Sequence, residues 1–484
     1  MKINIQPISN VVGVLLIVIG VLMYCCIPFG LHHHSGDAGA LFEAGTITIV
    51  VGILFWKYKF KSNAIVNKRE GYLIVAVGWL SMIVFGALPY YFSGVTASIT
   101  DAVFESVSGL TTTGATIFTD IEFLPKGILV WRSLTQWVGG MGIIVLTVAI
   151  FPLLGIAGIE LFGAEAPGPK SDKIHPRIKE TAKRLWYIYV GLTGILFLLL
   201  MIEGMPFYDS LNHALTTMAT GGFSIKNNSI AFYTSPLIQY TITLFMFIAG
   251  TNYTVLYFGF KRKWKNVLRS DEFKFYVTLV FLLAAIITFT IFSKTDYNLE
   301  ESFRYGTFQM ISILTTTGYV TDDYTSWSNG LTMIFFILLF VGACAGSTSG
   351  GIKLIRHLVF LKNTILEFKR ILHPRAIIRM KIDGKMVAPR IMTHILVFLL
   401  VYLIAFIGGS VLVTILGMDF ESSIGAVATS LGNVGPGIGT VGPVNNFSLV
   451  PIPAKWILSF LMLMGRLELF TILILFFPYF WRNN

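Results

Sequence analysis

Long apolar runs separated by short polar gaps follow one another from one end of the chain to the other. Clear examples lie at residues 11–28, 73–92, 185–202, 275–292, 394–416 and 456–477. A helix needs about 20 apolar residues to cross a bilayer, and a soluble core supplies only one or two such runs. The sequence lacks the alternation of apolar and polar residues that a membrane barrel requires. The pattern therefore predicts an all-α integral membrane protein.

Composition supports this class. Hydrophobic residues make up 55% of the chain, charged residues make up 13%, and the mean hydropathy is +0.74. A soluble domain carries roughly 25% charged residues, so about half of the usual charge is missing.

The basic residues gather in alternate polar gaps. Stretches 57–69, 170–184, 261–274 and 353–390 hold most of the 36 lysines and arginines, whereas the gaps between them are acidic. The positive-inside rule places the basic gaps in the cytoplasm, together with the N-terminus. Topology thus explains the net charge of +11, and we expect no nucleic-acid partner.

An internal repeat lies in the outward-facing stretches 101–114, 209–221, 302–318 and 419–435. Each has an acidic start, a short amphipathic helical segment and a cluster of threonine and glycine, and the last glycines are 107, 97 and 117 residues apart. Each stretch lies between two spanning runs. Four pseudo-symmetric units of helix, pore loop and helix are therefore predicted around one pore. Two extra N-terminal helices, near 11–28 and 45–56, bring the total to about ten spanning helices.

Glycine loops of this kind are suited to a cation pathway. Non-helical backbone is tolerated at membrane depth only where it lines water or is buried in protein, so four such loops predict one shared axis. Their carbonyl oxygens can replace the hydration shell of an alkali cation, and glycine lets the backbone turn them there. Each half-helix points its negative end toward the membrane centre, which favours a cation by roughly 0.3–1 kcal/mol.

Several motifs then carry a resemblance to known proteins: Phe104-Glu-Ser with Leu110-Thr-Thr-Thr-Gly-Ala-Thr116, Gln136-Trp-Val-Gly-Gly-Met-Gly-Ile143, Ala164-Glu-Ala-Pro-Gly-Pro169, Pro176-Arg-Ile-Lys-Glu-Thr-Ala182, Gly221-Gly-Phe-Ser224, Ala345-Gly-Ser-Thr-Ser-Gly-Gly-Ile-Lys353, Asn433-Val-Gly-Pro-Gly437 and Gly465-Arg-Leu-Glu468. Together they resemble the Trk/Ktr/HKT superfamily of potassium transporters, most closely the bacterial TrkH potassium uptake family. The resemblance covers nearly the whole chain.

The resemblance implies that Gly114, Gly221, Gly318 and Gly435 are the selectivity glycines, and that glycine rather than serine at 114 favours potassium over sodium. In the second loop Gly222 follows Gly221, so its register could be off by one. The fourth loop lacks threonines, which leaves room for weaker discrimination. The predicted potassium filter comprises Thr112, Thr113, Gly114, Thr220, Gly221, Gly222, Thr316, Thr317, Gly318, Asn433, Val434 and Gly435.

The third unit departs from the plan after its filter, because four glycines within residues 342–351 interrupt an apolar run. Each glycine costs a helix about 1 kcal/mol relative to alanine. In a family with this pore, such a loop looks like an intramembrane gate over 342–352, and a kinked packing site for small residues is the alternative. The predicted gate residues are Gly346, Ser347, Thr348, Ser349, Gly350, Gly351 and Lys353. The stretch lacks the ending and the preceding strand of a phosphate-binding loop.

Arg466 interrupts the last apolar run. An intramembrane arginine is costly and is a functional candidate by default. The resemblance implies that it projects into the pathway and limits ion flow. The alternative is a pair with a buried carboxylate other than Glu468, since residues two apart on a helix do not face one another.

Function and surroundings follow from the same resemblance. It implies K⁺ uptake across the bacterial inner membrane, a homodimer with one pore per protomer, and a cytosolic TrkA-like regulatory ring that binds NAD or ATP. K⁺ is then the transported ion, and we expect no organic cofactor on this chain. An H⁺- or Na⁺-coupled potassium symporter and a less selective K⁺/Na⁺ pathway stay open. The sequence offers no nucleophile paired with a base, so an enzyme, or a membrane scaffold, is a distant alternative.

The predicted domain boundaries follow from the repeat. They are two N-terminal helices at 1–68, pore repeats at 69–160, 183–260, 273–367 and 391–484, and cytoplasmic linkers at 161–182, 261–272 and 368–390.

Overall fold

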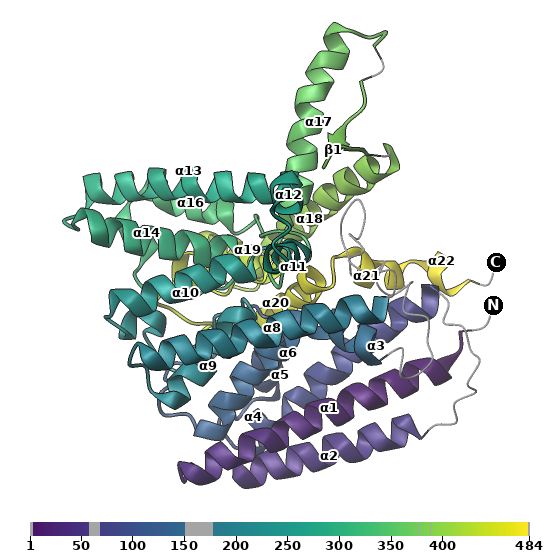
Figure 1. The fold of residues 1–484 in the computed structure, drawn as a ribbon. Helices are drawn as coiled ribbons and strands as arrows, with labels where there is room; N and C mark the ends of the chain where they lie inside the picture. Colours follow the sequence, from purple (N-terminus) through teal and green to yellow (C-terminus); the bar gives the residue numbers. More distant parts are fainter. Residues whose placement is uncertain (1–2, 58–67, 151–177, 377, 388, 483–484) are drawn as a thin grey trace.

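Long helices running side by side dominate the computed structural model, which describes residues 3–57, 68–150, 178–376, 378–387 and 389–482 (Figure 1). Within these residues, six single helices are long and apolar enough to cross a membrane, or eight spans if two bent helix pairs each count as one. The second spans of the first and third units are not in this count. The predicted all-α membrane fold is confirmed.

The N-terminal pair consists of α1 (Ile5–His32) and α2 (Ala38–Trp56). Glycines bring the two helices together: a Cβ on Gly13 would lie 2.6 Å from the Gly52 carbonyl oxygen, and one on Gly20 would lie 2.9 Å from the Gly45 carbonyl oxygen. Small residues let membrane helices approach closely and gain packing contacts. The pair is fixed to the rest by Asp37, whose carboxylate accepts a 2.8 Å hydrogen bond from the Ile128 N–H.

The first two units follow the predicted plan. Unit 1 contains α3 (Lys68–Gly86), the short α4 (Leu88–Phe92), the half-helix α5 (Ile99–Leu110) and α6 (Lys126–Ile150). Unit 2 contains α8 (Ile178–Ile202), the half-helix α9 (Phe207–Met218), the 3₁₀ turn η1 (Ser229–Phe232), α10 (Pro236–Ala249) and α11 (Tyr253–Phe260). The short α12 (Trp264–Arg269) leads into the next unit.

The last two units repeat the arrangement. Unit 3 contains α13 (Asp271–Lys294), the half-helix α14 (Leu299–Leu314), α15 (Tyr324–Trp327), α16 (Asn329–Leu338) and α17 (Leu354–Leu372). Unit 4 contains α18 (Pro389–Ile415), the half-helix α19 (Phe420–Gly432), η2 (Gly439–Val441), α20 (Ile452–Arg466), α21 (Phe470–Leu473), η3 (Ile474–Phe476) and α22 (Pro478–Trp481).

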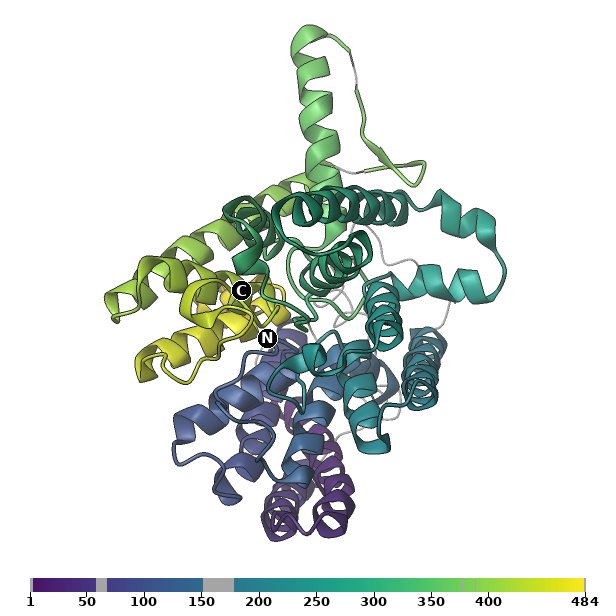
Figure 2. The ribbon, with the colours of Figure 1, turned by 90° about the vertical axis from the view of Figure 1, so that its left-hand side faces the viewer.

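One small element is not helical. Strands β1 (Lys381–Ile382) and β2 (Lys385–Met386) form an antiparallel hairpin between α17 and α18. Its turn places Asp383 at φ +51° and Gly384 at φ +74°, as a tight hairpin turn requires. Helix α17 and this hairpin extend away from the bundle of long helices in both views (Figures 1 and 2).

The second span is interrupted in every unit, not only in the third as the sequence indicated. Helix α6 has non-helical backbone at Gly142, α10 and α11 meet at 106°, and α20 and the segment after it meet at 109°. In unit 3 the loop between α16 and α17 takes the place of the bend. Non-helical backbone at this depth has to be buried in protein or to line a cavity, so all four breaks indicate a shared interior.

The four units surround that interior in chain order, which Figure 2 shows from the end of the long helices. Hydrogen bonds between the segments that follow the four predicted filter loops connect each unit to the next. The Ile121 N–H donates to the Asn227 carboxamide (2.7 Å) and the Ala231 N–H to the Val320 carbonyl (3.0 Å). The Tyr324 hydroxyl donates to the Gly437 carbonyl (2.6 Å), and the Phe447 N–H donates to the Thr116 carbonyl (2.8 Å), which closes the circle.

Replacing Gly13 by valine should destabilise the N-terminal pair. The new Cβ would lie 2.5 Å from the Trp56 backbone nitrogen, and relieving such a clash costs about 1–3 kcal/mol. Thermal unfolding in detergent measures the effect. Gly39→Val is the matched control on α2, because nothing lies within 4 Å of its Cβ position. Equal unfolding temperatures for the two variants would contradict the glycine-mediated packing.

Candidate ion filter and gate

Each half-helix ends at a residue with left-handed backbone. These residues are Thr112 (φ +54°), Thr220 (φ +53°), Thr316 (φ +56°) and Asn433 (φ +54°). Only a few per cent of residues other than glycine adopt such a φ. Four of them at one point of four units therefore mark a shared construction.

The hydrogen bonds around these residues are the same in all four units. Each left-handed residue donates its N–H to the carbonyl three residues earlier, at 2.9–3.3 Å. The next residue donates to the carbonyl five residues earlier, at 2.8–3.0 Å. This pair of bonds defines the Schellman ending of a helix, and it aligns the four loops residue by residue.

The alignment decides the register of the second loop. Two residues after each left-handed residue stands a glycine with positive φ: Gly114 (+83°), Gly222 (+74°), Gly318 (+80°) and Gly435 (+105°). The structural counterpart of Gly114 is therefore Gly222. Gly221, which the sequence interpretation favoured, corresponds instead to Thr113, Thr317 and Val434. We call residues 112–114, 220–222, 316–318 and 433–435 the filter loops.

The filter loops form a closed ring. A Cβ on Gly114 would lie 2.3 Å from the Gly221 carbonyl oxygen, and one on Gly222 would lie 1.9 Å from that of Thr317. The same holds for Gly318 against the Val434 oxygen (2.0 Å) and for Gly435 against the Thr113 oxygen (2.7 Å). Each glycine thus lies against the middle carbonyl of the next loop, with no room for a side chain.

Side chains at the ring differ between units. In units 1 and 3, hydroxyl pairs bridge Thr111 to Thr113 (2.7 Å) and Thr315 to Thr317 (2.8 Å). In unit 4 the Asn433 carboxamide donates to the Thr113 hydroxyl (3.0 Å) and to the Met462 carbonyl (2.8 Å). The backbone is therefore close to four-fold symmetric, whereas the side chains are not.

A polar side chain on the half-helix holds the segment after the filter in three units. It stands seven residues before the left-handed residue, at Glu105, His213 and Gln309, and the fourth unit has Ala426 there. Glu105 accepts from the Ile117 N–H (3.1 Å), His213 Nε2 contacts the Ser224 hydroxyl (3.0 Å), and Gln309 donates to the Asp322 carbonyl (2.9 Å). The sequence interpretation gave these residues no role, although Glu105 belongs to a motif quoted above and their constant distance from the left-handed residues is visible in the sequence.

Glu105 also forms an ion pair within unit 1, and its partner Arg132 extends the contact to unit 2. Its carboxylate lies 2.8 Å from Arg132 Nε, and the two side chains are 0% and 1% exposed. The guanidinium donates further to the Ser224 carbonyl of unit 2 (3.1 Å) and lies 4.0 Å from the centre of the Phe223 ring. A buried pair is tolerated only when additional hydrogen bonds satisfy both groups, and here the pair connects two segments that follow the filter.

The predicted gate loop lies directly against the filter loops. The Gly350 N–H donates to the hydroxyl of Thr316 (2.6 Å), and the Thr348 hydroxyl is 3.3 Å from that of Thr220. A Cβ on Gly350 would lie 2.7 Å from Asn433 Cβ. The loop therefore contacts the left-handed residues of units 2, 3 and 4.

Arg466 connects the gate loop to unit 1. Its guanidinium donates to the Thr348 carbonyl (2.9 Å), to the Gly140 carbonyl (3.0 Å) and to the Gly139 carbonyl. The structure thus places Arg466 against two backbone carbonyls of α6 that immediately precede its break at Gly142, and against one carbonyl of the loop 342–352. Lys353, the last predicted gate residue, donates to the carbonyl and hydroxyl oxygens of Ser349.

Glu468 forms an ion pair with Arg356 and not with Arg466, as expected from its spacing to Arg466. It lies 2.5 Å from Arg356 Nη2 at the start of α17. Two adjacent residues, Glu468 (φ +61°) and Leu469 (φ +42°), have left-handed backbone at the break of the last span. Such strain of order 1–3 kcal/mol per residue occurs where the surrounding structure imposes it.

Acidic residues begin the half-helices. Asp419 accepts a 2.9 Å hydrogen bond from the Ser422 N–H at the start of α19, and this bond lowers the pKa of Asp419. The Asp209 carboxylate lies 3.8 Å from Lys226 Nζ, which partly neutralises it. An ionised carboxylate at a helix N-terminus is stabilising, so these acids stabilise the half-helices as well as adding negative charge.

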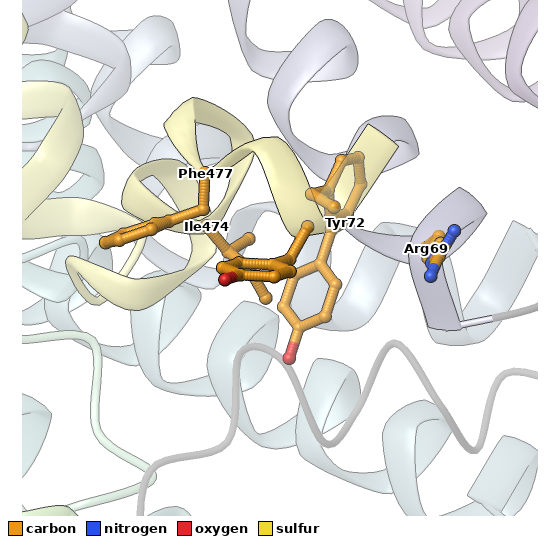
Figure 3. Close-up of a pocket in the computed structure, with 6 residues that line it drawn as sticks. Arg69, Tyr72, Ile474 and Phe477 are labelled. Atoms are coloured by element: carbon orange, nitrogen blue, oxygen red, sulfur yellow. The ribbon is translucent and has the colours of Figure 1, made fainter. Parts of the chain in front are cut away.

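A cavity of about 330 Å³ lies apart from the filter, at the end of the molecule where the termini lie (Figures 1 and 3). Arg69, Tyr72, Ile474, Phe477, Tyr479 and Phe480 line it. The Arg69 guanidinium donates to the Arg482 carbonyl (2.7 Å). This cavity contains no residue of the filter loops or of the gate loop.

The sequence profile of the TrkH family, described as a cation transport protein, matches residues 38–482. This chain belongs to the TrkH family. It is 39% identical over 483 residues to the Trk system potassium uptake protein TrkH of Escherichia coli strain K12, with 99% of each chain covered. TrkH of Halomonas elongata is 38% identical, over 99% of this chain and 100% of the relative.

Structural comparison agrees. The crystal structure of the potassium transporter TrkH from Vibrio parahaemolyticus matches with a TM-score of 0.89 and 35% sequence identity, over 99% of this chain and 100% of that one. These relatives are potassium transporters and not enzymes, which confirms the family and the expectation of no enzyme. Several parts of the sequence interpretation fall outside the described residues. These are the motif at 164–169, the first two residues of the motif at 176–182, the basic stretch 170–177 and most of the predicted linker 161–182.

Glu105→Gln should destabilise this TrkH-family protein strongly. The substitution leaves Arg132 buried without its counter-charge, at a cost of about 3–5 kcal/mol. Denaturant titration of the protein in detergent measures the decrease in the free energy of unfolding. The control is Glu300→Gln, which removes an ion pair with Arg304 whose carboxylate is 49% exposed; that loss is about 1 kcal/mol or less. A Glu105 variant no less stable than the Glu300 variant would contradict the role of the buried pair.

Proposed function

We propose that this chain takes up K⁺ across the bacterial inner membrane through one pathway whose selectivity filter is formed by the four filter loops. The observation that carries the proposal is the closed ring, in which each filter glycine lies against the middle carbonyl of the next loop. Backbone carbonyls gathered in this way can replace the water around an alkali cation. The names of the relatives, all potassium uptake proteins, favour K⁺ as the cargo.

Glycine at 114 supports selectivity for potassium. A larger residue would have to displace the Gly221 carbonyl oxygen, because its Cβ would lie 2.3 Å away. Discrimination between K⁺ and Na⁺ depends on the positions and number of the coordinating oxygens. The fixed backbone geometry of the ring therefore favours one ion size.

The gate in this proposal is the loop 342–352, held closed by Arg466. The loop contacts the left-handed residues of units 2, 3 and 4, and Arg466 connects the loop to unit 1. A guanidinium in a narrow, weakly hydrated passage also repels a passing cation. Opening therefore requires two changes. The loop has to separate from Thr316, and the Arg466 side chain has to separate from the carbonyls of α6.

Regulation and assembly belong to the proposal as well. We propose a homodimer and a cytosolic TrkA-like ring, binding NAD or ATP, that docks on the basic cytoplasmic surface. The basic residues between α17 and α18 support a docking face of this kind, because charge steers the association of proteins. A dependence of K⁺ entry on an H⁺ or Na⁺ gradient would make the pathway a symporter.

Gly114→Ser should raise Na⁺ permeation relative to K⁺. The serine Cβ forces the neighbouring Gly221 carbonyl out of the ring, and the coordination distances change. Flux of ⁸⁶Rb⁺ and ²²Na⁺ into proteoliposomes measures the ratio. Gly94→Ser is the matched control: Gly94 also has positive φ (+71°) but nothing lies within 4 Å of its Cβ position. An unchanged ratio in the Gly114 variant would rule out the filter assignment.

Arg466→Ala should increase K⁺ flux, because it removes both the charge and the connection between the gate loop and α6. Arg466→Lys separates the two effects, since lysine keeps the charge but lacks the planar fork of donors. Stopped-flow flux into proteoliposomes measures both variants, and an unfolding curve checks that each is folded. A well-folded Arg466→Ala protein with unaltered flux would contradict the role in gating.

Deleting residues 346–350 tests the loop itself. The deletion removes the contacts with Thr316 and Thr220, and we expect a leakier pore that no longer closes. Flux in the absence of any cytosolic partner is the measurement. A folded deletion variant that still closes would favour a packing role for the glycines.

A further inference from the structure

Gln136 on α6 of unit 1 reaches into the filter loop of unit 2. Its side chain is fully buried. The carboxamide nitrogen donates to the Gly221 carbonyl oxygen at 2.6 Å, and the carboxamide oxygen accepts from the Phe223 N–H at 3.0 Å. One side chain therefore holds the backbone on both sides of Gly222, the filter glycine of that unit.

The second loop lacks the hydroxyl pair that binds the loops of units 1 and 3 internally. Units 1 and 3 have hydroxyl pairs, Thr111 with Thr113 and Thr315 with Thr317. The corresponding residues of unit 2 are Ala219 and Gly221, which have no hydroxyl to offer. The loop of unit 2 is thus held by a side chain from the neighbouring unit.

Glycine at 221 is explained by this neighbour and not by backbone conformation. Gly221 does not have positive φ, unlike Gly222, so other residues suit its backbone. A Cβ at 221 would, however, lie 2.4 Å from both Cδ and Oε1 of Gln136. The carboxamide occupies the space that a threonine side chain would take.

We propose that Gln136 is a positioning residue of the ion filter: its carboxamide replaces the missing middle side chain of the second filter loop and fixes the Gly221 carbonyl. The inference rests on the proposed function, because it assigns a role in selectivity. The held carbonyl is the one against which Gly114 packs, so Gln136 connects the filter loops of units 1 and 2. Releasing it lets the ring adapt to the smaller Na⁺.

A double-mutant cycle at Gln136 and Gly221 tests the proposal. Gln136→Met keeps the size of the side chain but cannot donate, and we expect the K⁺/Na⁺ flux ratio to fall about fivefold or more. Gly221→Thr alone should lower the ratio too, because the threonine clashes with Gln136. Gln136→Ala, the single variant that the cycle needs, should lower the ratio as well. In the double variant Gln136→Ala with Gly221→Thr, the threonine fills the vacated space, and the ratio should recover in part. Residues in contact show such non-additivity.

The control is Gln239→Met, which changes another buried glutamine in the same way. Gln239 binds the Tyr233 carbonyl and Arg304, and it does not contact the filter loops. The flux ratio of this variant should match that of the unchanged protein. A folded Gln136→Met protein with an unchanged ratio, or additive effects in the cycle, would overturn the proposal. If the methionine variant does not fold, the double variant decides: a ratio no higher than that of Gly221→Thr alone counts against it.

The Gly114→Ser variant distinguishes failure of this inference from failure of the proposed function. If Gly114→Ser loses selectivity while Gln136→Met keeps it, the filter assignment stands and the positioning role is wrong. If neither variant changes the ratio, the filter itself is wrongly assigned.

Discussion

The contact between each filter glycine and the middle carbonyl of the next loop is the constraint on which the rest of this structure depends. It requires four glycines with positive φ, at 114, 222, 318 and 435, and excludes a Cβ at each of them. It also requires four half-helices that end alike, which the Schellman hydrogen bonds provide. Hydrogen bonds outside the ring connect the four units and hold these loops against one another.

That holding is shared between neighbouring units. Backbone hydrogen bonds connect the segments after the filter in a circle, and the buried pair of Glu105 and Arg132 strengthens the connection between units 1 and 2. The breaks in all four second spans admit the gate loop and Arg466 to the interior. The predicted filter and the predicted gate loop are therefore in direct contact, Thr348 with Thr220 and Gly350 with Thr316.

Much of this architecture was predictable from the sequence, because the apolar runs and the four Thr/Gly clusters are local patterns. The register of the second loop was not, since Gly221 and Gly222 are chemically identical and only backbone angles separate them. The breaks in the second spans of units 2 and 4 contain one glycine each, Gly250 and Gly465, whereas unit 1 has three glycines at its break, Gly139, Gly140 and Gly142, which were not interpreted as a break. Gln136 and Arg132 act on backbone of the next unit, far along the chain, and no local pattern reveals a contact of that kind. The sites of filter and gate remain predictions that the geometry supports.

The central claim is that four loops around one axis select K⁺. It is tested most directly by comparing K⁺ and Na⁺ uptake into proteoliposomes that contain this chain alone, under equal inward gradients. The account predicts K⁺ entry down its own gradient, with Na⁺ entering much more slowly. Equal rates for the two ions would contradict it.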